Sequence, residues 1–550
     1  MRGGFGRFFV TALVCIVSLA GCQSTNAADP PTADMLTRAI NKLDPETLID
    51  GGDLRLPLAQ FPTNFNPLTI DSVSAYPMYA TAAYPRAFTV NTDGSHVLNT
   101  DYFTAAEQTG VDPQVITYTI NPAAVWTDGT PITWQDMKSQ AHALSGKDDR
   151  YHVFSTVGYD RVESVTAGVN DRQAVVRFAR PYAEWLTLFS GTDVLLPRAM
   201  TETPEAFADA QHDRPGPSAG PFVVSGIDAE NRRIVFSRNE RWWGRPPRLN
   251  TISLVTIEPT GWLDALHDGT IDATEVDTAI QVAAAARIPD IEVRQAPTPA
   301  VWSVFFNGSQ DSWLADPALR QAIARGIDRD RIIEVTQRGL TDSPVDSTSH
   351  IFANGQPGYR DNADGYDYDP YRARQELDAL GWKMSPSGVR EKDGHQLTLT
   401  NLYVESPSGD LLGQLLAEML DGIGVDLIAN DFTAEEAAIE LPHYDLLTFA
   451  MNTAGSPLAM VPVYYRGGGY YNMLTTSTPD LDAKIDQLLG ETGDTALNTA
   501  NEIDEMLWQE AHSVPLLRIP GNTAVRRDLA NFGAFGAADV DFTAIGYCGC

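Results

Sequence analysis

Strand-like and helix-like segments alternate along almost all of this 550-residue chain, and this alternation constrains the fold more than any other feature. Apolar runs such as Leu54–Leu58 and Val301–Phe306 are typical of strands. Amphipathic runs between them begin at helix-capping signals such as Asp316-Pro317 and Asp369-Pro370. The sequence has no solenoid repeat and no coiled-coil heptad. The pattern predicts an α/β protein with more than one sheet.

Shorter signals locate individual elements. Thr133 and Asp136 have the spacing of a capping box, which predicts the start of a helix. Val162–Val165 and Ala174–Phe178 alternate on either side of a turn and predict a hairpin. Leu411–Ile423 has the apolar spacing of an amphipathic helix.

The N-terminus carries the signature of an exported, lipid-anchored protein. Arg2 and Arg7 form a basic segment before a mostly apolar run, Phe8–Leu19. The run has the length of the apolar core of a secretory signal and is too short to span a bilayer. Leu19-Ala20-Gly21-Cys22 resembles a bacterial lipobox, so we expect removal of the first 21 residues and acylation of Cys22. An ordinary cleaved signal with a chance cysteine is the alternative. Residues 22–49 are predicted to form a tether.

The mature chain is strongly acidic. The formal charge of −33 becomes −35 over the remaining 529 residues, because Arg2 and Arg7 leave with the signal. Nucleic acids and anionic membranes bind basic clusters, so neither is expected as a partner. Acidic residues spread along the chain are typical of a solvated surface. We expect membrane contact only through the lipid anchor, on the outer face of the cell membrane.

Motifs for catalysis and metal binding are out of context. Gly216–Gly220 places Ser218 in G-x-S-x-G, but Pro221 and a strand follow where a nucleophile elbow needs a helix. Gly467–Gly469 lacks the lysine of a phosphate-binding loop. The scattered histidines show no metal-ligand spacing; they include His142, His212, His443 and His512. We predict that the protein is not an enzyme and has no cofactor and no metal.

Two cysteines end the chain. Cys548 and Cys550 could close a small ring, stay reduced or pair between molecules. The sequence favours a loose tail without function, since no neighbouring histidine completes a metal site.

Five strings occur in a characteristic order. They are Trp126-Thr-Asp-Gly-Thr-Pro-Ile-Thr, Ser218-Ala-Gly-Pro-Phe, Arg238-Asn-Glu-Arg-Trp-Trp-Gly, Asp316-Pro-Ala-Leu-Arg-Gln-Ala-Ile, and Tyr368-Asp-Pro followed by Leu380-Gly-Trp. Together they resemble the extracytoplasmic solute-binding proteins of peptide ABC importers, the dipeptide- and oligopeptide-binding family 5. The likeness spans almost the whole mature chain and is strongest to mycobacterial dipeptide-binding lipoproteins.

The resemblance implies a type II periplasmic-binding-protein-like fold, in which two α/β lobes are joined by a two-strand hinge. The first lobe would comprise residues 50–300 and 515–550, with an extra subdomain at about 71–184, and the second lobe residues 301–514. The ligand would be buried between the lobes as they close. The implied function is capture of peptides outside the membrane and their delivery to the permease and ATPase subunits of an importer.

The resemblance also implies a peptide that is held largely through main-chain hydrogen bonds. The implied ligand contacts are Asp71, Trp302, Phe305, Met451, Asn452, Thr453 and Gly455. Core packing is the alternative for the two aromatic residues, and a helix cap is the alternative for Asp71. Relatives carry an aspartate for the peptide's ammonium group in the segment that matches 450–455, where this chain has no carboxylate. Either Asp71 or Asp445 replaces it, or the ligand lacks a free α-amine.

Three other functions stay open from the sequence. The same fold could bind a non-peptide solute such as haem or a metal chelate, which the missing carboxylate favours. A non-transport envelope regulatory lipoprotein is the second alternative. An esterase or peptidase that uses Ser218 is the third.

Overall fold

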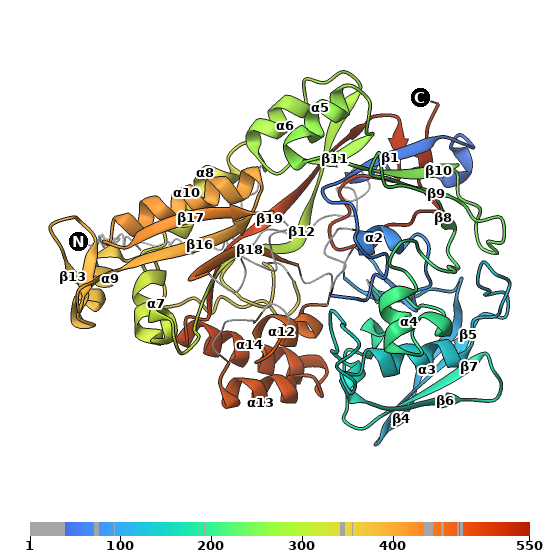
Figure 1. The fold of residues 1–550 in the computed structure, drawn as a ribbon, viewed down its shortest axis with the longest axis horizontal. Helices are drawn as coiled ribbons and strands as arrows, with labels where there is room; N and C mark the ends of the chain where they lie inside the picture. Colours follow the sequence, from blue (N-terminus) through green and yellow to red (C-terminus); the bar gives the residue numbers. More distant parts are fainter. Residues whose placement is uncertain are drawn as a thin grey trace, which may run out of the picture.

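A computed structural model describes residues 39–549 apart from 71–75, 93, 192, 342–346, 355, 434–443, 453–455, 470–471 and 473–476. The predicted signal, the lipid site and most of the predicted tether therefore lie outside the described residues. The described part contains one six-stranded sheet and two four-stranded sheets, with helices packed against them (Figure 1). The fold is α/β with more than one sheet, as the sequence predicts.

The first four-stranded sheet has the order β1-β10-β9-β8. Its strands are β1 (Asp53–Leu58), β8 (Phe222–Asp228), β9 (Arg233–Arg238) and β10 (Thr251–Thr256), with β1 parallel to β10 and the other pairs antiparallel. Leu54, Leu56 and Leu58 alternate along β1 and are all buried, which is the period-2 pattern of a strand with one face in a core. The short helix α2 (Tyr76–Ala80) contributes Tyr76 and Ala80 to the same core.

The second four-stranded sheet, β4-β5-β7-β6, is antiparallel throughout. Its strands are β4 (Phe103–Val111), β5 (Gln114–Ile120), β6 (Val162–Ala167) and β7 (Gln173–Phe178). β6 and β7 form the predicted hairpin. Helix α3 (Trp134–Ala143) packs on this sheet and begins at the predicted capping box of Thr133 and Asp136. The small elements beside it are β2 (Phe88–Val90), β3 (His96–Leu98) and α4 (Pro204–Asp209).

The six-stranded sheet has the order β11-β19-β12-β18-β16-β17. Its strands are β11 (Ala273–Glu275), β12 (Ile291–Phe306), β16 (Thr398–Val404), β17 (Asp426–Phe432), β18 (Leu446–Asn452) and β19 (Ser513–Arg526). β12 pairs antiparallel with both β18 and β19, whereas β16 is parallel to β17 and β18. The helices that share its core are α7 (Pro317–Ala324), α8 (Arg329–Gln337), α9 (Pro370–Ala379) and α10 (Pro407–Asp421).

The two longest strands, β12 and β19, join the two halves of the molecule. At one end of β12, Ile291 belongs to a small core with α5 (Trp262–His267) and α6 (Ala279–Ala285). At its other end, Val304 and Phe306 belong to the core beneath α10. Figure 1 shows β12 and β19 running between the half that holds β1 and β10 and the half that holds β16 and β17. The molecule is therefore two-lobed. The lobe limits predicted at 300/301 and 514/515 fall inside these two strands.

Three helices that lie between β18 and β19 in the chain belong to the half with the six-stranded sheet and also pack against the other half. They are α12 (Pro457–Tyr465), α13 (Pro479–Leu488) and α14 (Gly493–Gln509). Their apolar residues Tyr464, Ile485 and Ile503 share one core cluster with Leu54 and Tyr118 of the other half.

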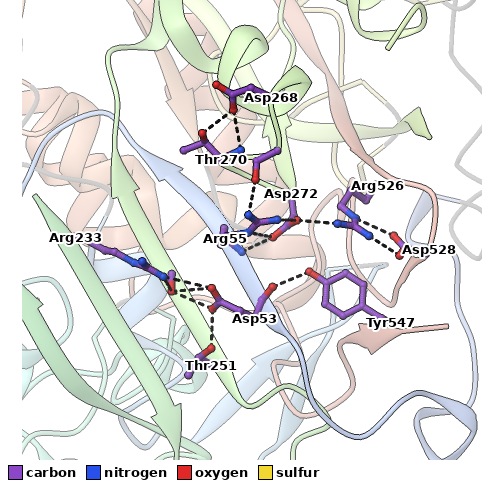
Figure 2. A network of polar contacts seen from close by, with 12 residues as sticks. Asp53, Arg55, Arg233, Thr251, Asp268, Thr270, Asp272, Arg526, Asp528 and Tyr547 are labelled. Atoms are coloured by element: carbon purple, nitrogen blue, oxygen red, sulfur yellow. Dashed lines mark hydrogen bonds and ion pairs between the residues drawn. The ribbon is translucent and has the colours of Figure 1, made fainter. Parts of the chain in front are cut away.

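The end of the chain is anchored to β1 through a polar network (Figure 2). The Tyr547 hydroxyl donates to the carbonyl of Asp53 at 2.8 Å. The buried carboxylate of Asp272 accepts from Arg55 at 2.6 Å and lies 3.6 Å from the guanidinium of Arg526. Cys548 is disulfide-bonded, and it packs with Leu48 and Ala530. The predicted loose tail is therefore wrong as far as Cys548; Cys550 lies outside the described residues.

Candidate functional site

A pocket of about 580 Å³ lies where the two halves meet. One wall comes from Pro259 and Leu263 near α5 and from the start of α6, and the opposite wall comes from α8 and α10. Trp302 of β12 and Leu517 of β19 line it between those walls. In Figure 1, α5 and α6 lie above one end of the β12–β19 pair, and α8 and α10 lie above its other end, beside β16 and β17. Any movement of one half relative to the other therefore changes the shape of this pocket.

Two helices begin at the pocket. Thr278 caps α6 in a reciprocal capping box with Gln281, and Ser406 caps α10 by accepting from the amide of Gly409. Both caps follow a strand directly, since α6 comes after β11 and α10 comes after β16. In α/β proteins, ligands bind in crevices outside the carboxyl ends of strands, and helix N-termini present backbone N–H groups there. The pocket has this placement in both halves.

The two halves touch at the rim of the pocket. The Ser408 hydroxyl of α10 donates to the carbonyl of Asp277 at 3.1 Å. The Gln295 amide of β12 donates to the carbonyl of Leu340 at 2.8 Å. The bond from Ser408 to Asp277 joins the two halves at this rim.

The pocket is acidic. Asp277 and Asp410 are the only charged residues among the described residues that line it. Burial raises the pKa of Asp277 above its ordinary value, and a bond with Ser408 opposes that shift. The pKa of the nearby Glu275 is raised by burial and then by the charge of Asp277, although the Glu275 side chain is exposed to solvent.

The two predicted aromatic contacts lie on opposite faces of β12. Trp302 is half-buried and lines the pocket. Phe305 is fully buried on the other face, where its ring stacks on Phe449 with 4.7 Å between centroids and meets His512 edge-on at 5.7 Å. Residues three apart on a strand face opposite ways, so the structure does not bring these two rings together.

Of the other predicted ligand contacts, two have hydrogen-bonding partners within the protein, and the rest lie outside the described residues. Met451 is buried, and its sulfur accepts from the Tyr465 hydroxyl at 3.1 Å. Asn452 ends β18, and its backbone N–H and carbonyl both bond to the Tyr464 hydroxyl. Asp71, Thr453, Gly455 and the lipid site Cys22 lie outside the described residues.

Asp445, one of the two acids considered as a replacement clamp, lies at the opposite end of β18 from Asn452. Its carboxylate accepts from the backbone N–H of Thr400 at 2.8 Å, and its backbone N–H donates to the carbonyl of the same residue. These bonds fix the register between β16 and the start of β18. Asp445 therefore has a structural partner at a distance from the pocket.

Sequence reasoning missed the acidic segment at the end of β11. Glu275 and Asp277 come directly before the Thr278 cap, and they alternate with apolar residues. Carboxylates between the end of a strand and the cap of the next helix indicate a binding crevice, because the carboxyl end of the strand and the N-terminus of the helix face the same crevice.

The serine of the G-x-S-x-G string, Ser218, lies in the loop before β8, where its backbone bonds to Thr127. No helix follows it, as predicted.

Among the described residues, no group of three potential metal ligands is present. None of the helices in the described ranges combines the length and apolar character that crossing a membrane requires.

A two-lobed fold with a pocket between its halves is typical of solute-binding proteins. The sequence profile described as bacterial extracellular solute-binding proteins, family 5 Middle, matches residues 101–472. The chain belongs to this family, which is a family of solute-binding proteins and not of enzymes. Its members act outside the cytoplasm.

Relatives extend the match along the chain. The chain is 46% identical over 553 residues to the oligopeptide-binding protein OppA of Mycobacterium tuberculosis, covering 98% of this chain and 93% of the relative. It is 28% identical over 64% of its length, and 54% of the relative's, to the probable monoacyl phosphatidylinositol tetramannoside-binding protein LpqW of the same species.

Solved structures share the fold at low sequence identity. The periplasmic EDTA-binding protein EppA matches with a TM-score of 0.85 at 21% identity, covering 93% of this chain and 99% of that one. The oligopeptide-binding protein AppA of Bacillus subtilis, solved with a nonapeptide, matches with a TM-score of 0.80 at 15% identity, covering 91% and 99%. These likenesses establish the two-lobed fold.

Proposed function

We propose that the protein captures peptides between its two halves and delivers them to the permease of an ABC importer. Acylation of Cys22 would hold it at the outer face of the cell membrane. Support comes from the family, from the 46% identity to an oligopeptide-binding protein, and from the two-lobed fold. The observation that carries the proposal is the pocket lined by Trp302, α6 and α10, because it takes its walls from both halves.

The lining favours a peptide over an anionic chelate. A metal chelate of the EDTA type carries several carboxylates, and the described residues of this pocket supply only Asp277 and Asp410 as charged groups. Like charges brought together away from water repel, so such a solute would be disfavoured here. A peptide offers backbone donors and acceptors together with apolar side chains, which match the helix N-termini and the apolar walls.

Delivery requires the two halves to move, and a hinge motion would change the contacts between them. Arg161 Nη2 lies 2.7 Å from the Asp486 carboxylate of α13. The Ala183 N–H donates to the carbonyl of Leu489 at 2.9 Å. These contacts and the bond from Ser408 to Asp277 would form on closure and break on opening.

Titration calorimetry with a panel of pentapeptides, each free and N-acetylated, tests the proposal. We expect binding in the micromolar range, and we expect Trp302→Ala to weaken it. Phe305→Ala is the control, since it should lower the free energy of unfolding by about 3–5 kcal/mol through loss of core packing. No heat of binding for any peptide with the folded protein would refute peptide capture.

A further inference from the structure

We propose that this pocket selects a lysine or arginine side chain of the bound peptide, with Trp302 along the apolar stem and Asp277 at the charged end. The inference rests on the peptide capture proposed above and specifies which residue the pocket accepts.

The charge of the pocket is the first argument. No lysine, arginine or histidine is among the described residues that line it, whereas two carboxylates are. Burial raises the pKa of Asp277, a bond with the neutral Ser408 hydroxyl opposes that shift, and no cation of the described residues forms an ion pair with this carboxylate. The charge of Asp277 raises the pKa of Glu275, which lies two residues before it. A partly desolvated carboxylate without a cationic partner is stabilised when a ligand supplies the cation.

The apolar wall is the second argument. Leu263, Ile280 and Leu411 line the pocket together with Trp302, Leu517 and Ile519. The stems of lysine and arginine pack on apolar surface while their charged ends reach polar groups. An indole face also attracts a cation, and arginine more often than lysine. A volume of about 580 Å³ leaves room for such a side chain and its water.

Position is the third argument. Asp277 is half-buried, and its backbone carbonyl holds Ser408 of the opposite half at 3.1 Å. A cation bound by the Asp277 carboxylate would therefore lie beside the contact that joins the two halves. Its binding would favour the closed arrangement. An acidic or neutral side chain would leave the carboxylate without a cation at the same place.

The test compares the pentapeptide Ala-Ala-Arg-Ala-Ala with the same peptide carrying citrulline in place of arginine, which keeps the shape and removes the charge. With the wild-type protein we expect the arginine peptide to bind at least about tenfold more tightly, since bonds to charged groups are worth more than neutral ones. Asp277→Asn should reduce this preference to less than about threefold, because it should weaken binding of the arginine peptide more than binding of the citrulline peptide. Circular dichroism and thermal unfolding check that the variant is folded.

Asp264→Asn is the matched control, because Asp264 is an exposed carboxylate on α5 that does not line the pocket. It should keep the preference of the wild type. Equal affinity of the wild-type protein for both peptides would overturn the inference and leave peptide capture standing. A preference that survives Asp277→Asn would overturn it as well. Binding of neither peptide would refute both proposals.

Discussion

His512 is a buried residue whose protonation links this protein's stability to pH. Burial lowers the pKa of His512 to about 3, and electrostatic interactions with His350 and Arg320 lower it further. Its ring contacts Phe305 and Tyr465 edge-on, and Nε2 lies 3.1 Å from the Asn472 side-chain oxygen. The imidazole of the folded protein is therefore neutral at pH values well above 3.

Stability should consequently fall in acid. Below the unfolded-state pKa of about 6.5, the unfolded chain binds a proton at His512 that the folded protein does not. The free energy of unfolding should therefore decrease by about 1.4 kcal/mol per pH unit from this group between about pH 6 and pH 4. Urea unfolding of the wild type and His512→Gln across this range measures the difference. Parallel pH profiles would contradict a neutral buried histidine.

Trp302 and Phe305 show which properties of a single residue the sequence predicts and which it does not. Both are aromatic residues of a strand that the sequence predicts at 301–306, and the strand is confirmed. The sequence alone did not decide which one faces a ligand, because both faces of β12 are apolar. The pairing of β12 with β18 and β19 decides it, since it places α8 and α10 over one face and His512 over the other.

At the scale of elements, local signals located helices well. The Asp316 carboxylate accepts from the N–H of Ala318, and that of Asp369 accepts from the N–H of Arg372, as capping residues ahead of proline should. The length of β12 was not predictable from the sequence, because Pro297 and Pro299 interrupt the apolar pattern and predict the end of one strand and the start of another. The strand tolerates them at an irregularity between Pro297 and Val301, where ladder pairing is interrupted.

The close approach of Gly52 to Tyr547 belongs to this scale, because Gly52 directly precedes β1 and Tyr547 ends the short strand β21 (Gly546–Tyr547). Gly52 has φ of +98°, and a Cβ at this position would lie 2.8 Å from the Tyr547 ring. Gly52→Ala should therefore lower the free energy of unfolding by about 2–4 kcal/mol through backbone strain and overpacking.

Gly269→Ala is the matched control for this prediction. Gly269 also has a positive φ, of +78°, but a Cβ there would meet nothing within 4 Å. It should show only the backbone cost, about 1 kcal/mol. Thermal unfolding of the two variants compares these effects, and equal losses would exclude a packing role for the contact with Tyr547.

At the scale of the whole molecule, Asp486 connects the halves. Its carboxylate accepts from Arg161 at 2.7 Å and lies 3.5 Å from Arg180 in one half, and it lies 3.2 Å from Arg466 in the other. Asp486→Ala should weaken closure, so small-angle scattering should give a larger radius of gyration without peptide than for the wild type. Peptide affinity should fall about three- to tenfold, because fewer molecules are closed before binding.

Lys484→Ala is the control for closure, since its partner Glu502 lies in the same half. This variant should keep the wild-type dimensions and affinity. If Asp486→Ala also keeps both, the contacts of Asp486 do not govern closure.

The sequence by itself determined the α/β class, the order of most strands and helices, the helix caps and the family resemblance, because these depend on residues near one another in the chain. Only the tertiary structure decided the pocket. Asp277 and Ser408 are 131 positions apart, and they meet because β12 and β19 pair along their length and bring α6 opposite α10. Such long-range pairing leaves no local pattern in the sequence. The acidic lining of the pocket therefore could be identified only from the tertiary structure.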